Sequence, residues 1–172
     1  ISYDIIIPSD YMIERLKNEN MLSKIDTTKL SNYDLIEDKY KNLFFDPNNE
    51  YSVPYNVGLV GIIYNEKLTG KDIKHSWDVL WDEKYKDMAL NFSNPRDAFM
   101  TAQMLLGQDL NTLNKADWDA AAELLKKGKA NLQSYVMDEI FGKMETGEAA
   151  VAPYYAGDYL TMLETNPDLR FF

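Results

Sequence analysis

Short apolar runs alternate with amphipathic segments along the whole chain, and this alternation limits the possible folds more than any other feature. The pattern predicts strands at 3–7, 87–92, 132–136, 149–152 and 169–172, and an extended apolar stretch at 57–64. It predicts helices at 11–20, 76–81, 97–106, 117–127, 139–145 and 159–164. Since strands that alternate with helices usually pair in parallel, we expect an α/β fold with a largely parallel sheet.

Four glycines refine this pattern. Gly107 and Gly128 follow predicted helices, where a glycine commonly takes the C′ position. Gly58 and Gly61 interrupt the extended stretch, which indicates bends or a close approach of backbone segments. A domain boundary is expected near 57–66, because no helix interrupts the chain there, although one ordinary buried strand would explain the same residues.

The composition excludes several classes of function. The 172 residues include 18 Lys and Arg, 28 Asp and Glu, one histidine and no cysteine, so the formal charge is 18 − 28 = −10. Without cysteine there is no disulfide, no cysteine-ligated zinc or iron–sulfur site and no thiol nucleophile. An acidic chain is a poor ligand for phosphate, so we expect no nucleic-acid partner. No apolar run approaches the roughly 20 residues that cross a bilayer.

Both ends of the chain have the pattern of strands. Domain termini are usually polar and frayed, so we expect the chain to be part of a longer protein.

Polar and aromatic residues gather in the turns between predicted strands and helices. These turns are Ser9–Tyr11, Asn94–Asp97, Met137–Glu139 and Tyr154–Asp158. A parallel sheet would present them at one edge, where open α/β sheets bind ligands. Two of them place Tyr beside Asp, and this pair suits an amine, because the ring attracts a cation that the carboxylate neutralises. Taken singly, each turn is also explained by a helix N-cap beside a half-buried aromatic ring.

The support for an enzyme is weaker. A carboxylate pair such as Asp97 and Asp158 would suit glycoside hydrolysis, but nothing in the sequence sets the separation that this reaction needs. His75, a lone loop histidine, is more typical of a surface or capping group than of a catalytic base. No phosphate-binding loop, dinucleotide fingerprint or nucleophile elbow occurs, and no cofactor is predicted.

Seven segments carry a resemblance to a known family. They are Tyr3–Tyr11, Met21–Asp26, Phe45–Tyr55, Gly61–Asn65, Ser76–Trp81, Asn94–Phe99 and Gly147–Glu148. In this order, along the whole chain, they resemble the extracytoplasmic spermidine/putrescine-binding proteins of bacterial ABC importers. The Pro-Tyr…Gly…Tyr-Asn part of this match is also similar to other binding proteins of the structural class, including those for ferric ion and thiosulfate.

The resemblance implies a type II periplasmic-binding-protein-like α/β fold. In that fold two lobes are joined by crossing hinge segments, and the ligand is trapped in the cleft between them. Residues 1–60 would then be part of the first lobe, and residues 61–172 most of the second. The first lobe would be incomplete, because the family's first strand would precede Ile1 and its return to that lobe would follow Phe172.

The resemblance also implies ligand contacts in the first lobe. The family's Ser-x-Tyr motif matches Ser9 and Tyr11. These residues would form a hydrogen bond to an amine and pack on its alkyl chain.

In the second lobe, the family's Asp-x-Arg-Glu turn corresponds to the segment from Asn94 to Asp97. Asp97 keeps the negative charge that pairs with an ammonium group. Asn94 is neutral, although it stands where the family has an aspartate. Tyr155 corresponds to a tryptophan of the family, and its ring still provides a face on which the ligand can stack. From the residues themselves we add Asp158, whose charge would compensate for these changes.

The function implied by the resemblance is binding without turnover. The ligand would be a polyamine, and the partners would be the membrane permease subunits of an ABC importer. The protein would be extracytoplasmic and would reach the membrane only through an anchor or a permease outside this chain. The main alternative is a solute-binding protein of the same fold that binds another small solute. Ferric ion is the leading example, since Tyr154 and Tyr155 could supply two phenolate ligands. A carbohydrate-active enzyme and a surface interaction module without a small ligand are further alternatives.

Overall fold

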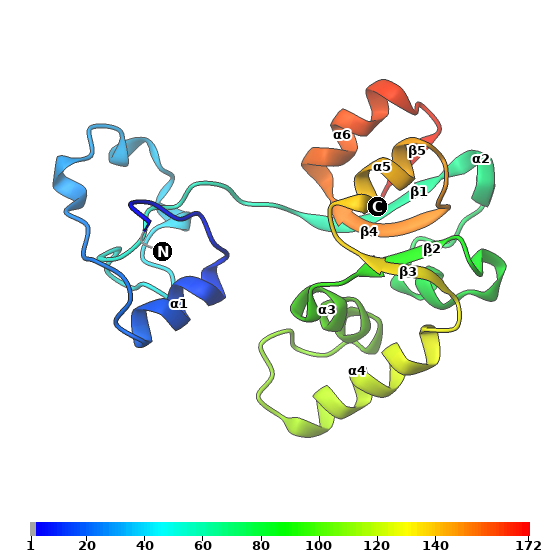
Figure 1. Ribbon diagram of the computed structural model, residues 1–172, viewed down its shortest axis with the longest axis horizontal. Helices are drawn as coiled ribbons and strands as arrows, with labels where there is room; N and C mark the ends of the chain where they lie inside the picture. Colours follow the sequence, from blue (N-terminus) through cyan, green and yellow to red (C-terminus); the bar gives the residue numbers. More distant parts are fainter. Residues whose placement is uncertain (1–2) are drawn as a thin grey trace. The chain divides into compact units, whose positions relative to one another are not determined.

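The computed structural model describes residues 3–172 and divides into two compact units, Ile1–Val57 and Gly58–Phe172 (Figure 1). We call them unit 1 and unit 2 and describe each by itself. The assignment of residues 1–60 and 61–172 to two lobes of a binding protein stays a prediction.

Residues 3–57 of unit 1 form one α-helix and three single turns of 3-10 helix. These elements are α1 (Asp10–Asn18), η1 (Thr27–Lys29), η2 (Tyr33–Leu35) and η3 (Asp38–Tyr40). Helix α1 confirms the helix predicted at 11–20. It begins after Ser9, whose carbonyl oxygen accepts hydrogen bonds from the amides of Met12 and Ile13 at 3.0 and 3.1 Å, while the Ser9 side chain makes no capping hydrogen bond.

The strand predicted at 3–7 is wrong for this structure. The described residues of this segment form no ladder, and the side chains of Ile5 and Ile7 are 83% and 69% exposed. A strand needs a hydrogen-bonded neighbour. Within the described part of unit 1 no other segment is a strand, so the apolar pattern has no partner to pair with.

A network of buried polar groups shapes the second half of unit 1. The carboxylate of Asp46 accepts hydrogen bonds from the amides of Tyr51 and Ser52 at 3.0 and 2.8 Å and from the Ser52 hydroxyl at 2.8 Å. Asn49 has a φ of +48° and accepts a hydrogen bond from the Tyr33 hydroxyl at 3.0 Å. The sequence Asp-Pro-Asn-Asn at 46–49 is a strong turn signal, and these bonds hold the turn and satisfy backbone groups that a sheet would otherwise pair.

Unit 2 is built on a five-stranded sheet with the order β3-β2-β4-β1-β5. The strands are β1 (Val60–Asn65), β2 (Ala89–Phe92), β3 (Leu132–Val136), β4 (Val151–Tyr155) and β5 (Leu169–Phe171). The predicted α/β class is confirmed.

The expectation of a largely parallel sheet is confirmed for β2, β3 and β4 and is wrong for β1, which is reversed. Strand β2 pairs in parallel with β3 and β4, whereas β1 pairs antiparallel with β4 and β5. A parallel arrangement needs a long crossover, usually a helix. Between β1 and β2 the chain forms only the four-residue α2 (Glu66–Thr69) and the 3-10 helices η4 (Trp77–Trp81) and η5 (Glu83–Tyr85).

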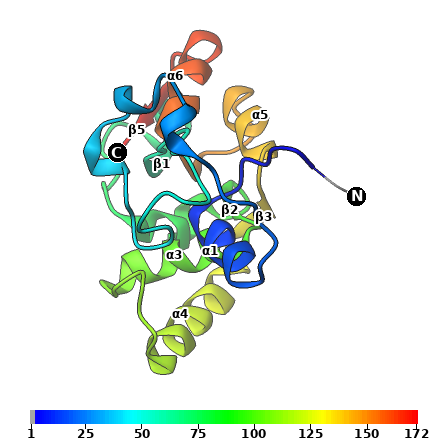
Figure 2. The same cartoon turned by 90° about the vertical axis from the view of Figure 1, so that its left-hand side faces the viewer.

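Helices cover both faces of this sheet. They are α3 (Pro95–Leu106), α4 (Lys115–Gly128), α5 (Glu139–Glu145) and α6 (Ala156–Thr165). Figures 1 and 2 show α5 and α6 on one face and α3 and α4 on the other. One core cluster includes Phe92, Ile140 and Met162, and the other includes Ile62 and Leu80. Among the helices of residues 3–172, none has the length and apolar character that a membrane crossing requires.

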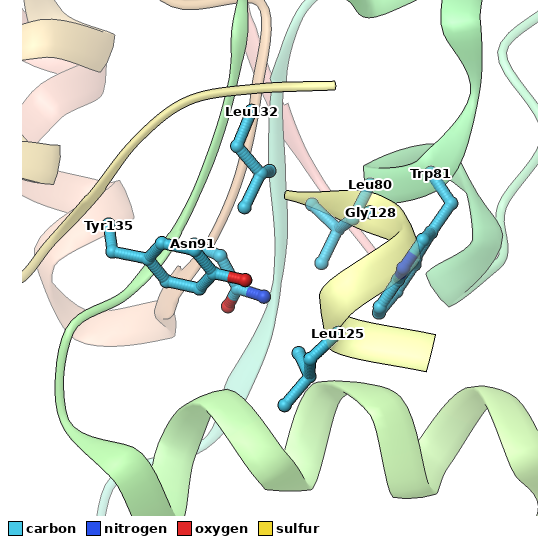
Figure 3. A pocket seen from close by; sticks show the side chains of 7 residues that line it. All are labelled: Leu80, Trp81, Asn91, Leu125, Gly128, Leu132 and Tyr135. Atoms are coloured by element: carbon cyan, nitrogen blue, oxygen red, sulfur yellow. The ribbon is translucent and has the colours of Figure 1, made fainter. Parts of the chain in front are cut away.

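The glycines of unit 2 have two different roles. Gly107 caps α3 with a φ of +65°, as predicted. The same prediction is wrong for Gly128, which is the last residue of α4 and precedes Lys129 in helical conformation. A Cβ at Gly128 would overlap the indole of Trp81, whose Nε1 donates to the Leu124 carbonyl at 2.9 Å. Figure 3 shows Trp81 beside Gly128. Close packing, not a left-handed conformation, therefore requires glycine there.

The other predicted close approach is confirmed at Gly61. A Cβ on this residue would overlap the carbonyl oxygen of Phe172 and the ring of Phe171. Glycine at this position allows β5 to lie against β1.

Candidate ligand-binding site

Three of the four predicted turns lie at one edge of the unit 2 sheet. Strands β3, β2 and β4 are neighbours and run parallel, so their carboxyl ends meet at that edge. The turns that follow them lead into α5, α3 and α6. The edge therefore gathers Asn94, Asp97, Asp138, Tyr155 and Asp158 from distant parts of the sequence. The fourth turn, at Ser9–Tyr11, belongs to unit 1.

The turn before α3 is held by its own asparagine. The amide oxygen of Asn94 accepts a hydrogen bond from the Arg96 amide at 3.0 Å, and Pro95 occupies the first helical position. This is a standard helix start. Capping uses one of the two lone pairs of the side-chain oxygen, so the other lone pair and the NH₂ group of Asn94 remain for a ligand.

Asp97 has a different environment in the first turn of the same helix. Its side chain is half-buried, and within residues 3–172 it makes no hydrogen bond or ion pair. Burial raises the pKa of the Asp97 carboxyl. A partly desolvated carboxylate without a partner is costly in the free protein and would gain from a bound cation.

Tyr155 ends β4 at the same edge. Its ring packs against Phe92 and Tyr154, with centroid distances of 6.0 and 5.2 Å. A Cβ added to Gly58 would lie 3.4 Å from Cδ1 of Tyr155. Val60 is the β1 partner of Tyr155, so this ring lies beside the segment through which the chain enters unit 2.

Negative charge gathers around the preceding residue, Tyr154. Burial and the carboxylates of Asp158, Asp138 and Glu139 raise the pKa of Tyr154 to about 12, and burial has the largest effect. Asp158 lies in the first turn of α6, and the two other acids lie at the start of α5. The sequence places Asp138 in a turn of interest and offers Tyr154 with Tyr155 as possible ferric ligands, but it does not show that Tyr154 is buried, because that burial depends on tertiary packing in the core cluster.

In unit 1 the predicted contacts stand at the start of α1. Ser9 is exposed and precedes the helix, and Tyr11 is half-buried in its first turn. The roles of these residues and of the four in unit 2 stay predictions.

His75 lies away from the sheet edge. Its ring stacks on Phe172 with a centroid distance of 4.5 Å and an interplanar angle of 8°, and its Nε2 is 3.5 Å from the hydroxyl of Tyr64. These neighbours belong to the core cluster that includes Ile62 and Leu80. Over residues 3–172, no group of three or more His, Cys, Asp or Glu side chains is arranged to hold a metal ion.

The family assignment rests on a match over nearly the whole chain. Residues 1–165 match the model of the bacterial extracellular solute-binding protein family. The chain belongs to this family. The resemblance carried by the seven sequence segments is thereby confirmed, together with the solute-binding-protein fold.

Individual solute-binding proteins give the same result. The spermidine/putrescine-binding periplasmic protein of Salmonella typhimurium is 33% identical over 156 residues, which are 91% of this chain and 45% of that protein. The spermidine/putrescine ABC transporter substrate-binding protein PotD of Streptococcus pneumoniae superposes with a TM-score of 0.81 at 33% identity. The Tp0655 (TpPotD) lipoprotein of Treponema pallidum does so with a TM-score of 0.86 at 26% identity. The alignments cover 99% and 96% of this chain and 53% of each of those chains.

The chain thus spans about half the length of the curated relatives that it matches. Its relatives are solute-binding transport proteins, as expected for a chain that binds rather than converts its ligand.

Proposed function

We propose that the protein binds a polyamine of the spermidine or putrescine type and delivers it to an ABC importer. The observation that carries the proposal is Asp97, a half-buried carboxylate without a partner among residues 3–172, on the same sheet edge as Tyr155 and Asp158. The names of the relatives support the same ligand class.

The chemistry of the edge fits an ammonium group. Asp97 supplies a negative charge in a partly desolvated place, where a charge pair is stronger than in water. The ring of Tyr155 supplies a face for the cation or the alkyl chain. By the family resemblance, Ser9 and Tyr11 of the first lobe (residues 1–60) would also contact the ligand.

The proposal extends to partners and location. The partners are the membrane permease subunits of the importer, and the protein works outside the cytoplasm, as the names of the relatives indicate for those proteins. We propose no enzymatic activity.

Ferric ion is the second candidate, because Tyr154 and Tyr155 are adjacent. Burial and nearby carboxylates raise the pKa of Tyr154 to about 12, so its phenol is neutral in the metal-free protein. In the described part of the chain, residues 3–172, no group of three or more His, Cys, Asp or Glu side chains is arranged to hold a metal ion beside it. The residues therefore favour an ammonium ligand.

Calorimetric titration of the complete gene product with spermidine, putrescine and ferric citrate tests the proposal. We expect heat of binding with an amine and none with iron. The absence of heat with every amine, at protein concentrations that detect micromolar binding, contradicts the proposal. Heat with ferric citrate alone supports the second candidate.

His75→Ala is expected to leave polyamine affinity within about twofold of the native value. The reason is that His75 packs on Tyr64 and Phe172 and has no contact with the turns at the sheet edge. The same calorimetric titration measures this. A large loss of affinity would point to catalysis or metal binding by the only histidine in the chain.

A further inference from the structure

The loop between α3 and α4 presents a leucine to solvent. Leu113 is 99% exposed, the largest exposed fraction among the large hydrophobic side chains of residues 3–172. Leu106, the last residue of α3, and Leu110 in the same loop are 43% and 41% exposed. Single exposed leucines are common on protein surfaces, but Leu113 is unusual in how the loop holds it.

Leu113 stands where a leucine normally packs on its own helix. It directly precedes Asn114, which caps α4 by accepting a hydrogen bond from the Ala116 amide at 3.0 Å. An apolar residue in this position often packs against the fourth residue of the helix, here Trp118. With 99% of its surface exposed, Leu113 does not make this contact. Trp118 packs instead on Phe99 of α3, with a centroid distance of 5.2 Å.

Hydrogen bonds hold the loop in the conformation that keeps Leu113 outside. The indole Nε1 of Trp118 donates to the Thr112 carbonyl at 2.9 Å. The Thr112 hydroxyl donates to the Asp117 carboxylate at 2.6 Å and accepts a hydrogen bond from the Asn114 amide at 3.1 Å. These bonds hold the backbone on both sides of Leu113. Little conformational entropy is therefore lost when a partner covers its side chain.

The charges around the loop favour a protein as that partner. Lys115 is the only basic residue between positions 107 and 119, and it pairs with Asp119 at 2.6 Å. An anionic lipid surface would attract a segment with several basic residues. A second copy of the chain would bring a further charge of −10, and a stable dimer buries about 20 to 30 residues on each side. Three leucines suit a small, transient contact with a different protein.

The loop lies on the same side of unit 2 as the candidate site. Figure 1 shows that the chain runs along α4 in one direction and returns along β3 in the other, so the start of α4 lies toward the edge where β3 ends. Asp97 and Tyr155 stand at that edge. A protein that contacts the loop would therefore meet the ligand side of this unit.

We propose that Leu113, with Leu106 and Leu110, docks the protein on the extracytoplasmic surface of a permease subunit of the importer. The partner surface that fits is an uncharged apolar pocket that takes up one leucine side chain. The contact is small, so it suits a partner that must be released after each delivery. This inference rests on the proposed function, which supplies the partner, and adds the surface that meets it.

The test measures binding of the complete gene product, with and without putrescine, to its ABC importer reconstituted in lipid nanodiscs. Leu113→Gln makes the exposed side chain polar at nearly constant size. Leu160→Gln is the matched control, because Leu160 is a 65% exposed leucine on α6, which covers the other face of the sheet. Thermal melting and calorimetric titration with putrescine show that the fold and the ligand site of each variant are intact.

We expect Leu113→Gln to weaken binding to the importer about ten- to a hundredfold, the effect of losing the complete burial of a leucine side chain. Leu160→Gln should bind the importer like the native protein. The putrescine affinities of both variants should stay within about twofold of the native value.

Native importer binding by Leu113→Gln overturns the inference and leaves the proposed function in place. Binding of the native protein to nanodiscs of lipid alone, or a dimer in sedimentation that Leu113→Gln removes, overturns it in favour of a lipid surface or a second copy. A native protein that binds putrescine but not the importer contradicts both the inference and the proposed partner. If the native protein binds the importer but no amine, the proposed ligand is wrong, and Leu113→Gln still decides the docking surface.

Discussion

Asp97→Asn is expected to weaken polyamine binding about a hundredfold or more. The variant leaves an ammonium group without its charge partner in a partly desolvated place, and such a loss is among the largest single effects in recognition. The substitution keeps the size of the side chain, so the helix start at Asn94 and Pro95 is not disturbed. Calorimetric titration with putrescine and spermidine measures the change.

The same substitution should raise the melting temperature of the free protein at neutral pH. Burial raises the pKa of Asp97 in the folded state, so the folded state binds its proton more readily than the unfolded state. Desolvation of the charged Asp97 carboxylate destabilises the folded state. This cost is absent below the pKa that Asp97 has in the unfolded chain and fully present above its pKa in the folded protein. The free energy of unfolding therefore falls as the pH rises through this range. Asparagine has no charge to desolvate, so the variant avoids this cost.

The affinity of the native protein for the ligand should show the opposite pH dependence and fall as acid protonates Asp97.

A surface acid provides the control for Asp97. Asp119→Asn changes an exposed residue of α4 that pairs with Lys115 at 2.6 Å, and exposed pairs contribute little. We expect native affinity and a nearly native melting temperature from this variant. Native polyamine affinity in Asp97→Asn would contradict the proposed role of Asp97.

Gly128→Ala is expected to lower the free energy of unfolding by about 2–4 kcal/mol, the sum of overpacking and one lost hydrogen bond. The new methyl group would overlap Nε1 and Cδ1 of Trp81, so the indole must move. Movement breaks its hydrogen bond to the Leu124 carbonyl. Figure 3 shows this indole beside the end of α4, where Leu80 and Leu125 pack around it. Urea denaturation followed by tryptophan fluorescence measures the loss.

Gly142→Ala is the matched control for this effect. Gly142 lies within α5, and a Cβ there meets no atom within 4 Å among the described residues. Alanine should stabilise this helix by about 0.5–1 kcal/mol, because it has the higher helix propensity. Equal effects of the two substitutions would show that the Trp81 contact does not determine the need for glycine at 128.

Helices and their caps were predictable because the signals are local. Asn94 followed by Pro95, and Gly107 after the last apolar turn, mark the two ends of α3 in the sequence, and the structure has both. The turn at 46–49 was predictable for the same reason, since a few neighbouring residues determine it.

Features that depend on distant partners were predicted less well. The apolar segment 3–7 has the pattern of a strand, yet a strand forms only where another segment pairs with it. The reversal of β1 depends on how 23 residues connect Asn65 to Ala89, and periodicity carries no information on strand direction. Gly128 was expected after α4 for its conformation, but the indole of Trp81, 47 residues earlier, is the reason for glycine.

By itself, the sequence determined the α/β class, the turns rich in Tyr and Asp, the acidic charge and the family. Each depends on local pattern, composition or the order of short motifs, which a linear chain contains in full. Only the tertiary structure decided that the turns before α3, α5 and α6 share one sheet edge, that Asp97 is half-buried without a partner among residues 3–172, and that Tyr154 is buried where nearby carboxylates help to raise its pKa. Burial and electrostatic proximity arise between residues far apart in the chain, so they exist only after the strands have been placed side by side.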